Sequence, residues 1–399
     1  MNKKLVALAV AGALALPLAA EAQTAQVTLY GRANMDLEFV KASGCGAAGG
    51  TLACGNTKQG STAVVTRVSS NSSRFGLRGT ESLGGGLTAF FQVENSVNWD
   101  GNGASNANTI ANRETFVGLQ GSYGQIWLGR SLSPYDDTTP IWAAGPYNYN
   151  TGLFNNSSLW ANNSNAIAGE ATGGYDDRYS NSIRWNSPTW SGFTAEVQVA
   201  TKENTGHSWV FAPGIFYNNG PIQAGLTYTR HDKIRCYNAA GTSYAACGGV
   251  PFAGLAANDD AVTVAGSYDF GIARVALMYE HLKYDTPTGD LKRDMWGISG
   301  TIPVGAGLVY AYFGQAGDGK GGAGDETPRI NSLAHGSDTG ARNFEIGYRY
   351  DLSKRTSLNA GYVRIDNESR ANYTFNVNGY AVKPGGDPQG FVLGIIHNF

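Results

Sequence analysis

Cysteine has the most distinctive chemistry of the residues in this chain, and four cysteines form two closely spaced pairs. Cys45 and Cys54 lie nine residues apart in a Gly/Ala/Thr-rich stretch, and Cys236 and Cys247 lie eleven residues apart in another loop-like stretch. Two local disulfides, 45–54 and 236–247, are the simplest pairing, and they suit an oxidising compartment. A zinc site would instead want CxxC spacing or nearby histidines. The five histidines are scattered, so we expect no metal and no cofactor.

Nucleophilic catalysis is the second chemistry to consider. It needs a histidine beside a serine or a carboxylate, but there is no GxSxG motif, and His207, His231 and His335 lie in loops or near expected strand ends. Residues 314–321, GQAGDGKG, approximate a phosphate-binding loop. No Ser or Thr follows Lys320 and no helical pattern comes after it, as such a loop requires. We therefore do not expect an enzyme.

Charged side chains are the third candidate, because they alternate with apolar ones. Over residues 26–39, QVTLYGRANMDLEF, the odd positions are apolar or small and the even positions are polar or charged. A period of two indicates an extended strand with two unlike faces. One face carries Arg32, Asp36 and Glu38, and the other carries Val27, Leu29 and Leu37. Charged groups that line water select ions by sign, so the chemistry depends on which face meets water.

The same alternation predicts about sixteen strands. They span residues 26–41, 64–81, 87–99, 112–121, 124–132, 178–187, 192–202, 208–218, 221–231, 260–270, 272–285, 291–303, 306–316, 341–352, 355–369 and 388–399. Short turns alternate with long polar stretches around 42–63, 133–177, 232–259 and 317–340. This order is typical of an up-and-down antiparallel meander. Many of the strands exceed the globular average of about five or six residues.

The first 22 residues differ from the rest. Lys3 and Lys4 precede an apolar run over residues 5–20, and Ala20-Glu21-Ala22 has the small-x-small form of a cleavage site. We interpret residues 1–22 as a secretory signal peptide and residues 23–399 as the mature domain. A retained membrane anchor is the alternative. No later run reaches about 18 apolar residues, the length of a transmembrane helix.

A soluble β-sandwich alternates in the same way, so the choice depends on the surrounding features. Aromatic residues cluster toward strand ends, at Trp127, Trp185, Tyr217, Tyr228, Tyr268, Tyr310, Tyr312 and Tyr350. Long alternating segments, aromatic girdles, an even strand number and unequal loops are typical of an outer-membrane β-barrel. Its apolar face meets lipid, and sixteen strands enclose an aqueous channel. The net charge of −2 argues against nucleic-acid binding.

Several motifs then resemble the general porins of Gram-negative outer membranes, of the β-proteobacterial type. They are VTLYGR, SSRFGLRGTESLGGGLTAFFQVEN, FVGLQGSYGQIWLGRSLSPYD and the terminal GIIHNF, and the resemblance runs from about residue 26 to 399. It implies an all-β, sixteen-stranded antiparallel barrel with long external loops, the third of which folds into the lumen. It also implies passive diffusion of small polar solutes and ions, a homotrimer, contacts with outer-membrane lipid and lipopolysaccharide, and insertion by the barrel assembly machinery.

The resemblance further implies a pore constriction. By motif, its basic side chains are Arg32, Arg74, Arg113 and Arg178. They would face acidic groups of the third loop, residues 133–177, for which we prefer Asp136 and Asp137 because these follow the strand directly. Parity supports Arg32, Arg74 and Arg178 as facing the lumen. Arg113 shares parity with largely apolar residues, so either a bulge shifts the register or the parity assignment is wrong.

The last residue, Phe399, ends an alternating strand and resembles the signal that the barrel assembly machinery recognises. Three alternatives to a general porin stay open: a substrate-specific porin, an outer-membrane barrel enzyme, and a structural barrel with a closed lumen. The substrate-specific class would want a run of aromatics along the channel wall, and none is expected at lumenal parity. The wall arginines favour anions, and the loop carboxylates could cancel that preference. The sign of the ion preference therefore also stays open.

Overall fold

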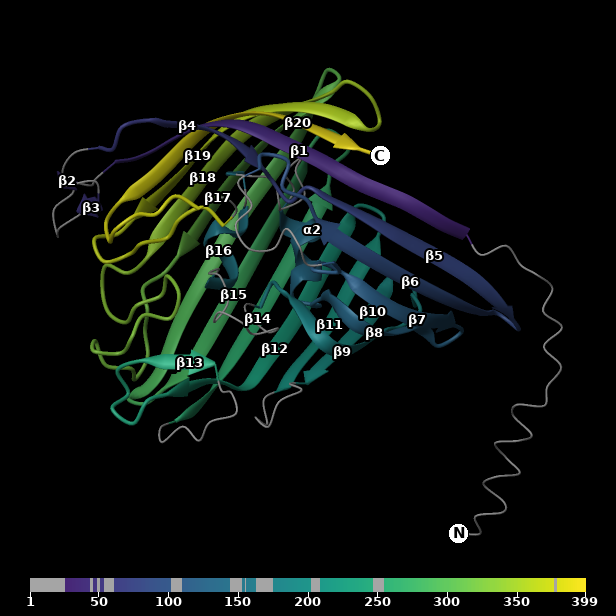
Figure 1. Ribbon diagram of the computed structural model, residues 1–399, viewed down its shortest axis with the longest axis horizontal. Coiled ribbons are helices and arrows are strands. Elements are labelled where there is room, and N and C mark those ends of the chain that lie inside the picture. Colours follow the sequence, from purple (N-terminus) through teal and green to yellow (C-terminus); the bar gives the residue numbers. More distant parts are fainter. Residues whose placement is uncertain are drawn as a thin grey trace, which may run out of the picture.

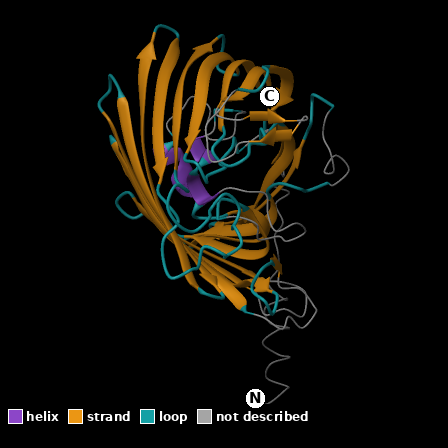
Figure 2. Ribbon diagram, turned by 90° about the vertical axis from the view of Figure 1, so that its left-hand side faces the viewer, coloured by secondary structure: helices purple, strands orange, loops and turns teal. Residues whose placement is uncertain are grey.

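The computed structural model shows long, tilted strands lying side by side around an interior that holds part of the chain (Figures 1 and 2). It describes residues 26–43, 46–48, 51–53, 61–101, 110–143, 153–154, 156–162, 175–201, 209–246, 255–376 and 379–399. The expected signal peptide and three of the four cysteines, Cys45, Cys54 and Cys247, lie outside these residues. Among the described residues, no helix is long and apolar enough to cross a membrane.

The strands of the wall follow one another around the ring. In chain order they are β1 (Gln26–Ser43), β4 (Val65–Ser70), β5 (Arg74–Gly84), β6 (Leu87–Ser96), β7 (Thr115–Gly121), β8 (Gly124–Leu132), β9 (Arg178–Asn186), β10 (Phe193–Thr201), β11 (Trp209–Asn219), β12 (Ile222–Tyr237), β14 (Ala256–Asp269), β15 (Arg274–Thr286), β16 (Gly289–Val304), β17 (Gly307–Ala316), β18 (Ala341–Asp351), β19 (Thr356–Asn367) and β20 (Asp387–Asn398). Among the described residues, β2 (Gly46–Ala48) and β3 (Thr51–Ala53) form a separate two-stranded sheet, and β13 (Tyr244–Ala246) pairs with the end of β12 as an extension of the wall.

The sheet closes on itself because the last strand pairs with the first. Neighbouring strands are antiparallel, and β20 pairs with β1 from Arg32↔Asn398 to Ser43↔Asp387. Both β4 and β5 pair with β1, so they count as one interrupted strand. Over the described residues the wall is therefore a closed barrel of sixteen antiparallel strands, which confirms the predicted fold class.

The break between β4 and β5 is a bulge opposite Asn34 of β1. The side-chain amide of Asn34 donates to the carbonyl of Asn71 at 2.9 Å, and its backbone N–H donates to the hydroxyl of Ser73 at 2.9 Å. The extra residue changes the parity of the strand. Residues seven positions apart on a regular strand face opposite sides, but the bulge lets both Arg67 and Arg74 face the lumen. There Arg67 pairs with Glu38 at 2.5 Å.

The two faces of the wall are inverted relative to a soluble protein. Leu29, Phe91 and Ile346 would be buried together in a sandwich, but they are 61%, 37% and 57% exposed on the outside. Asp36 and Glu38 are at most 1% exposed on the inside. The apolar face therefore points outward and the charged face inward, as the alternation predicted.

The aromatic residues divide between these faces. Phe193 packs on Tyr217, and Tyr268 on Phe270, each pair with ring centroids 4.6 Å apart near the short turns. These exposed rings fit the predicted girdle. Trp127, Tyr310 and Tyr312, which were expected in the girdle as well, are 7%, 1% and 3% exposed. That expectation is wrong, because the parity of these three residues turns them into the lumen.

A charge on the outer face should destabilise the barrel, whereas a charge on the lumenal face should not. We expect Ile346→Lys to lower the free energy of unfolding by about 2 kcal/mol or more, because lysine would meet lipid. Urea unfolding in lipid vesicles measures this, with Gln92→Lys on the lumenal face of β6 as the control. Equal loss in both variants would contradict the assignment of faces.

Candidate functional site

Two arginines of the inner wall converge on one carboxylate. The Nε atoms of Arg74 and Arg113 lie 3.4 Å and 2.5 Å from the carboxylate oxygens of Glu94. Tyr30 of β1 donates its hydroxyl to the same carboxylate at 3.2 Å. Strand register explains the meeting, because Gly76 of β5 lies between Tyr30 and Glu94 and carries no side chain to separate them. Two guanidiniums around one carboxylate leave an excess of positive charge.

The position of Arg113 depends on a second bulge. The N–H of Glu94 donates to the carbonyl of Glu114 at 3.0 Å, and the N–H of Arg113 donates to the carbonyl of Glu94 at 3.2 Å. Two residues thus oppose one, which is the pattern of a β-bulge. Of the two explanations that the sequence left open for Arg113, the structure shows the bulge.

Arg32 and Arg178 lie beside this pair. Arg32 is directly opposite Arg74 in the β1–β5 ladder, and its Nε donates to Oδ1 of Asn398 at 3.2 Å. Arg178 begins β9, and its charge acts on both Arg113 and Glu94. We call Arg32, Arg74, Arg113 and Arg178 the arginine wall. Its role as a constriction stays a prediction.

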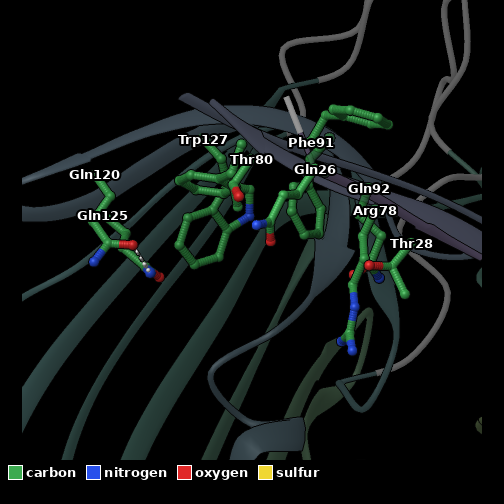
Figure 3. A pocket seen from close by; sticks show the side chains of 12 residues that line it. Gln26, Thr28, Arg78, Thr80, Phe91, Gln92, Gln120, Gln125 and Trp127 are labelled. Atoms are coloured by element: carbon green, nitrogen blue, oxygen red, sulfur yellow. Dashed lines mark hydrogen bonds between the residues drawn. The ribbon is translucent and has the colours of Figure 1, made fainter. Parts of the chain in front are cut away.

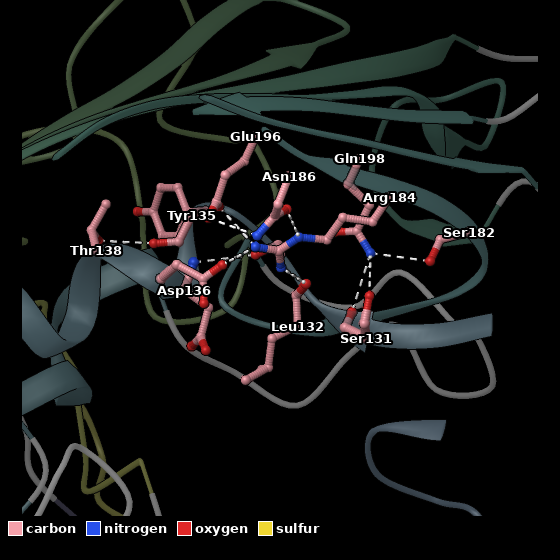
Figure 4. A network of polar contacts seen from close by, with 12 residues as sticks. Ser131, Leu132, Tyr135, Asp136, Thr138, Ser182, Arg184, Asn186, Glu196 and Gln198 are labelled. Atoms are coloured by element: carbon pink, nitrogen blue, oxygen red, sulfur yellow. Dashed lines mark hydrogen bonds and ion pairs between the residues drawn. The ribbon is translucent and has the colours of Figure 1, made fainter. Parts of the chain in front are cut away.

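Asp137, one of the two acidic residues expected from the third loop, pairs at the root of that loop. It forms an ion pair with Arg184 of β9, which also pairs with Glu196 of β10 at 2.8 Å (Figure 4). Arg184 donates further to the carbonyl of Leu132 at 2.7 Å and to Oδ1 of Asn186 at 3.0 Å. Within the described residues, Asp137 therefore pairs with Arg184 and not with the arginine wall.

Asp136, the other predicted acidic residue, lies in the neck of the loop. It begins η1 (Asp136–Thr138) and is 1% exposed, whereas the side chain of Asp137 is 34% exposed. The N–H of Asp136 donates to the hydroxyl of Ser133 at 3.3 Å, and that hydroxyl donates to the carbonyl of Tyr175 at 2.7 Å. These contacts bring the two ends of the loop together. A role for either carboxylate at the pore surface stays a prediction.

The described part of the third loop turns into the barrel. Besides η1 it contains α2 (Thr139–Trp142), η2 (Asn156–Ser158) and η3 (Trp160–Asn162). Figure 2 shows these helices inside the ring of strands, where α2 contacts β12, β14, β15 and β16 and η3 contacts β15. The carbonyl of Ile141 accepts a hydrogen bond from Arg274 at 2.6 Å, and the carbonyl of Trp142 accepts one from Ser299. The helices α2 and η3 of the loop thus lie against the wall opposite the arginines.

A buried ion pair on that opposite wall holds the loop. Glu280 of β15 and Arg293 of β16 are 2.5 Å apart and have fully buried side chains. Glu280 also accepts hydrogen bonds from the hydroxyl of Tyr135 and, at 2.6 Å, from the N–H of Ala161. Arg293 donates to the hydroxyl of Tyr373 at 3.1 Å. Burial and the Glu280 carboxylate raise the pKa of Tyr135, so its phenol stays protonated and remains a donor.

Aromatic packing fills this side of the lumen. Trp160 stacks on Tyr135 with centroids 4.6 Å apart and meets Trp142 edge-on at 5.3 Å. Phe154 packs edge-on against Tyr310 of β17 at 5.7 Å. The described loop residues reach from β12 to β20, because Phe154 also lies against Gly361 of β19 and Leu153 against Gly390 of β20.

Sequence reasoning missed Glu94, Arg184 and Glu280 as parts of this site. Glu94 and Arg184 lie on the polar parity of their strands, so parity together with the neighbouring arginines was a usable signal. Glu280 gave no such signal, because its partners Tyr135 and Arg293 come from other segments and meet it only in the folded chain.

A family model described as Gram-negative porin matches residues 7–370. The chain belongs to the Gram-negative porin family. Outer membrane porin protein 32 of Delftia acidovorans is 29% identical to this porin over 419 aligned positions, which cover all of both chains. Major outer membrane protein P.IA of Neisseria meningitidis is 26% identical and is covered over 97% of its length by 94% of this chain.

Solved structures agree with this family. The anion-selective porin from Comamonas acidovorans superposes with a TM-score of 0.71 at 25% identity, over 94% of this chain and 100% of that one. The trimer form of OmpT from Vibrio cholerae has a TM-score of 0.61 at 15% identity, over 94% and 100% of the two chains, and shows the fold alone. This porin is therefore a diffusion channel in the outer membrane of a Gram-negative bacterium and not an enzyme, as predicted.

The remaining predicted residues lie away from the arginines. Cys236, at the end of β12, is disulfide-bonded. Its expected partner Cys247 lies outside the described residues, as do Cys45 and Cys54, so both pairings stay predictions.

Phe399 lies where the barrel closes. It exchanges two backbone hydrogen bonds of 3.0 Å with Gly31 of β1. A Cβ at Gly31 would come within 2.3 Å of the Phe399 ring and 2.8 Å of the Arg74 carbonyl, so a side chain there would require both to shift. The Phe399 side chain is 41% exposed, and its role as an assembly signal stays a prediction.

The buried pair under the loop gives a stability prediction. Glu280→Gln removes the carboxylate that three loop and wall donors share, and it leaves the Arg293 charge buried. We expect it to lower the free energy of unfolding by about 3–5 kcal/mol. It should also increase the noise of the single-channel current, because the loop loses its contacts with Glu280. Urea unfolding and single-channel recording measure the two effects.

The control for this variant is Lys283→Gln, which removes half-exposed ion pairs with Asp285 and Asp290 on the outer side of β15. It should lower the free energy of unfolding by less than about 1 kcal/mol and leave the noise of the single-channel current unchanged. A quiet channel in Glu280→Gln as well would show that the loop does not depend on this pair.

Proposed function

We propose that this porin passes small hydrophilic solutes and ions between the third loop and the arginine wall, with a preference for anions. The observation that carries the proposal is the convergence of Arg74 and Arg113 on Glu94, with Arg32 and Arg178 beside them. Two guanidiniums contact one carboxylate there, the other two lie nearby, and Glu114 is a second carboxylate close to Tyr30. Arginine stays charged at any physiological pH, so the wall keeps its positive excess.

The two predicted loop carboxylates have other surroundings, whereas Asp177, at the end of the loop, accepts a hydrogen bond from the backbone N–H of Arg178 and lies 3.9 Å from Arg130. Asp137 pairs with Arg184, and Asp136 is buried in the neck of the loop. A narrow aqueous passage between low-dielectric walls strengthens the field of the arginines. Polar solutes align their dipoles with this field, whereas apolar solutes would displace oriented water. The relative from Comamonas acidovorans, which is described as anion-selective, supports the sign of the proposal.

The homotrimer, the contacts with lipid and lipopolysaccharide, and insertion by the barrel assembly machinery belong to the same proposal. The trimer is supported by family membership and by the trimer form described for OmpT of Vibrio cholerae, which shares the fold. Insertion by the assembly machinery is supported by the exposed aromatic side chain of Phe399. We also propose that residues 1–22 are a signal peptide that is removed on export.

Reversal potential in a salt gradient tests the proposal. In planar bilayers with a KCl gradient, we expect stepwise ohmic conductance and a reversal potential of the sign that chloride permeation gives. Arg74→Gln combined with Arg113→Gln should move the reversal potential toward potassium, because Glu94 is then left without its two guanidiniums.

A matched control is Arg342→Gln, because Arg342 is exposed at the long-loop end of β18, on the parity of Ile346. It removes one guanidinium from the outer face and should leave the reversal potential unchanged. A folded wild-type protein that carries no current would refute the channel. An unchanged potential in the double variant would place the arginine wall outside the selective region.

A further inference from the structure

A cavity of about 370 Å³ lies on the inner wall of β1 and β5 to β8, toward the short turns (Figure 3). Its apolar part consists of Phe90, Phe116 and Trp127, whose ring centroids lie 5.6 to 6.1 Å apart. Gly118 separates Phe90 from Trp127 in the ladder, and without a side chain it lets the two rings meet. The expectation of no lumenal aromatic run is therefore wrong. Each of three neighbouring strands contributes one ring, which no single-strand pattern reveals.

The indole of Trp127 forms one wall of this cavity. Trp127 is 7% exposed, and its indole N–H has no hydrogen-bond partner within the described residues. The guanidinium of Arg184 lies 5.2 Å from the centre of the Trp127 ring and holds its other face. The indole nitrogen itself is inaccessible to solvent, so Trp127 offers a bound molecule the apolar surface of its ring.

The guanidinium of Arg78 lies at the other side of the cavity. Arg78 is exposed to the lumen, lies 5.0 Å over the ring of Tyr30, and makes no ion pair within the described residues. In Figure 3 it points away from Phe91, which projects from the opposite face of the sheet. Polar amides complete the edge, where Gln125 donates to Gln120 at 2.9 Å.

We propose that this cavity is a subsite for a small aromatic carboxylate, and that it retains such solutes after they leave the arginine wall. The carboxylate would pair with Arg78, and the ring would pack on Phe90, Phe116 and Trp127. Cavities of this size accept small organic ligands, and a few placed polar groups fix their orientation. A neutral sugar would leave Arg78 unpaired, so we favour the anion.

The location fits passage through the pore, and the inference rests on the proposed diffusion function. Arg78 follows Arg74 by four residues on β5, which is about 13 Å of strand. An anion that passes the arginine wall therefore next meets Arg78 and the aromatic cluster. The cavity lies between the arginine wall and the short-turn end of the barrel.

Solute block of the ion current tests the subsite. In bilayers with KCl on both sides, 4-hydroxybenzoate should reduce the current at a concentration where acetate does not. Arg78→Gln should raise the half-blocking concentration by about tenfold or more, because a charge-assisted contact is lost. Phe116→Ala removes one of the three rings on which the solute would pack, and it should raise that concentration severalfold.

The matched control is Arg349→Gln, which removes a guanidinium that pairs with Asp351 on β18, on the other side of β1 from the cavity. It should leave the half-blocking concentration unchanged, and each variant should keep stepwise KCl conductance. Equal block by acetate, equal block by glucose, or no effect of Arg78→Gln would overturn the subsite and leave the diffusion channel intact. Loss of all conductance in the wild type would overturn the diffusion channel as well.

Discussion

Backbone hydrogen bonding in lipid is the constraint on which the rest of this structure depends. An unpaired N–H or carbonyl in hydrocarbon costs several kcal/mol, so a sheet can span a membrane only when no edge is left. The ladder between β20 and β1 removes that edge. Once the sheet is closed around water, each strand must present apolar residues outward and polar residues inward. The outward positions of Leu29, Phe91 and Ile346 follow from this closure.

Closure around sixteen strands leaves more space than the wall side chains fill, and this porin uses that space in two ways. On one side the third loop packs like a protein core, with Trp142 and Trp160 against the wall and the Glu280–Arg293 pair beneath them. On the other side the wall keeps guanidiniums in excess over carboxylates. The contacts on the first side hold the loop in position, and the proposed passage lies between the loop and the arginines.

The fold was predictable from the sequence because its main signal is local. A period of two is visible within each segment, so the strands and the direction of their faces could be assigned one at a time. The features that the sequence does not show are those fixed by neighbours far along the chain. Arg113 was predicted by resemblance, but the bulge that brings it to Glu94 is invisible to parity, and the partners of Glu280 come from other segments. Trp127 was assigned to the lipid interface because its distance from a strand end was considered and its parity was not.

The pairing of Phe399 with Gly31 has a consequence for synthesis of the protein. Gly31 belongs to β1, the first strand of the wall, and Phe399 directly follows β20, the last strand of the wall. The ring of strands therefore cannot be sealed until β20 has been made. A polypeptide that lacks even one strand of the wall has two open sheet edges. The backbone N–H and carbonyl groups of those edges find no hydrogen-bond partner in a bilayer. Completeness of the polypeptide is thereby a physical condition for stable residence in the membrane.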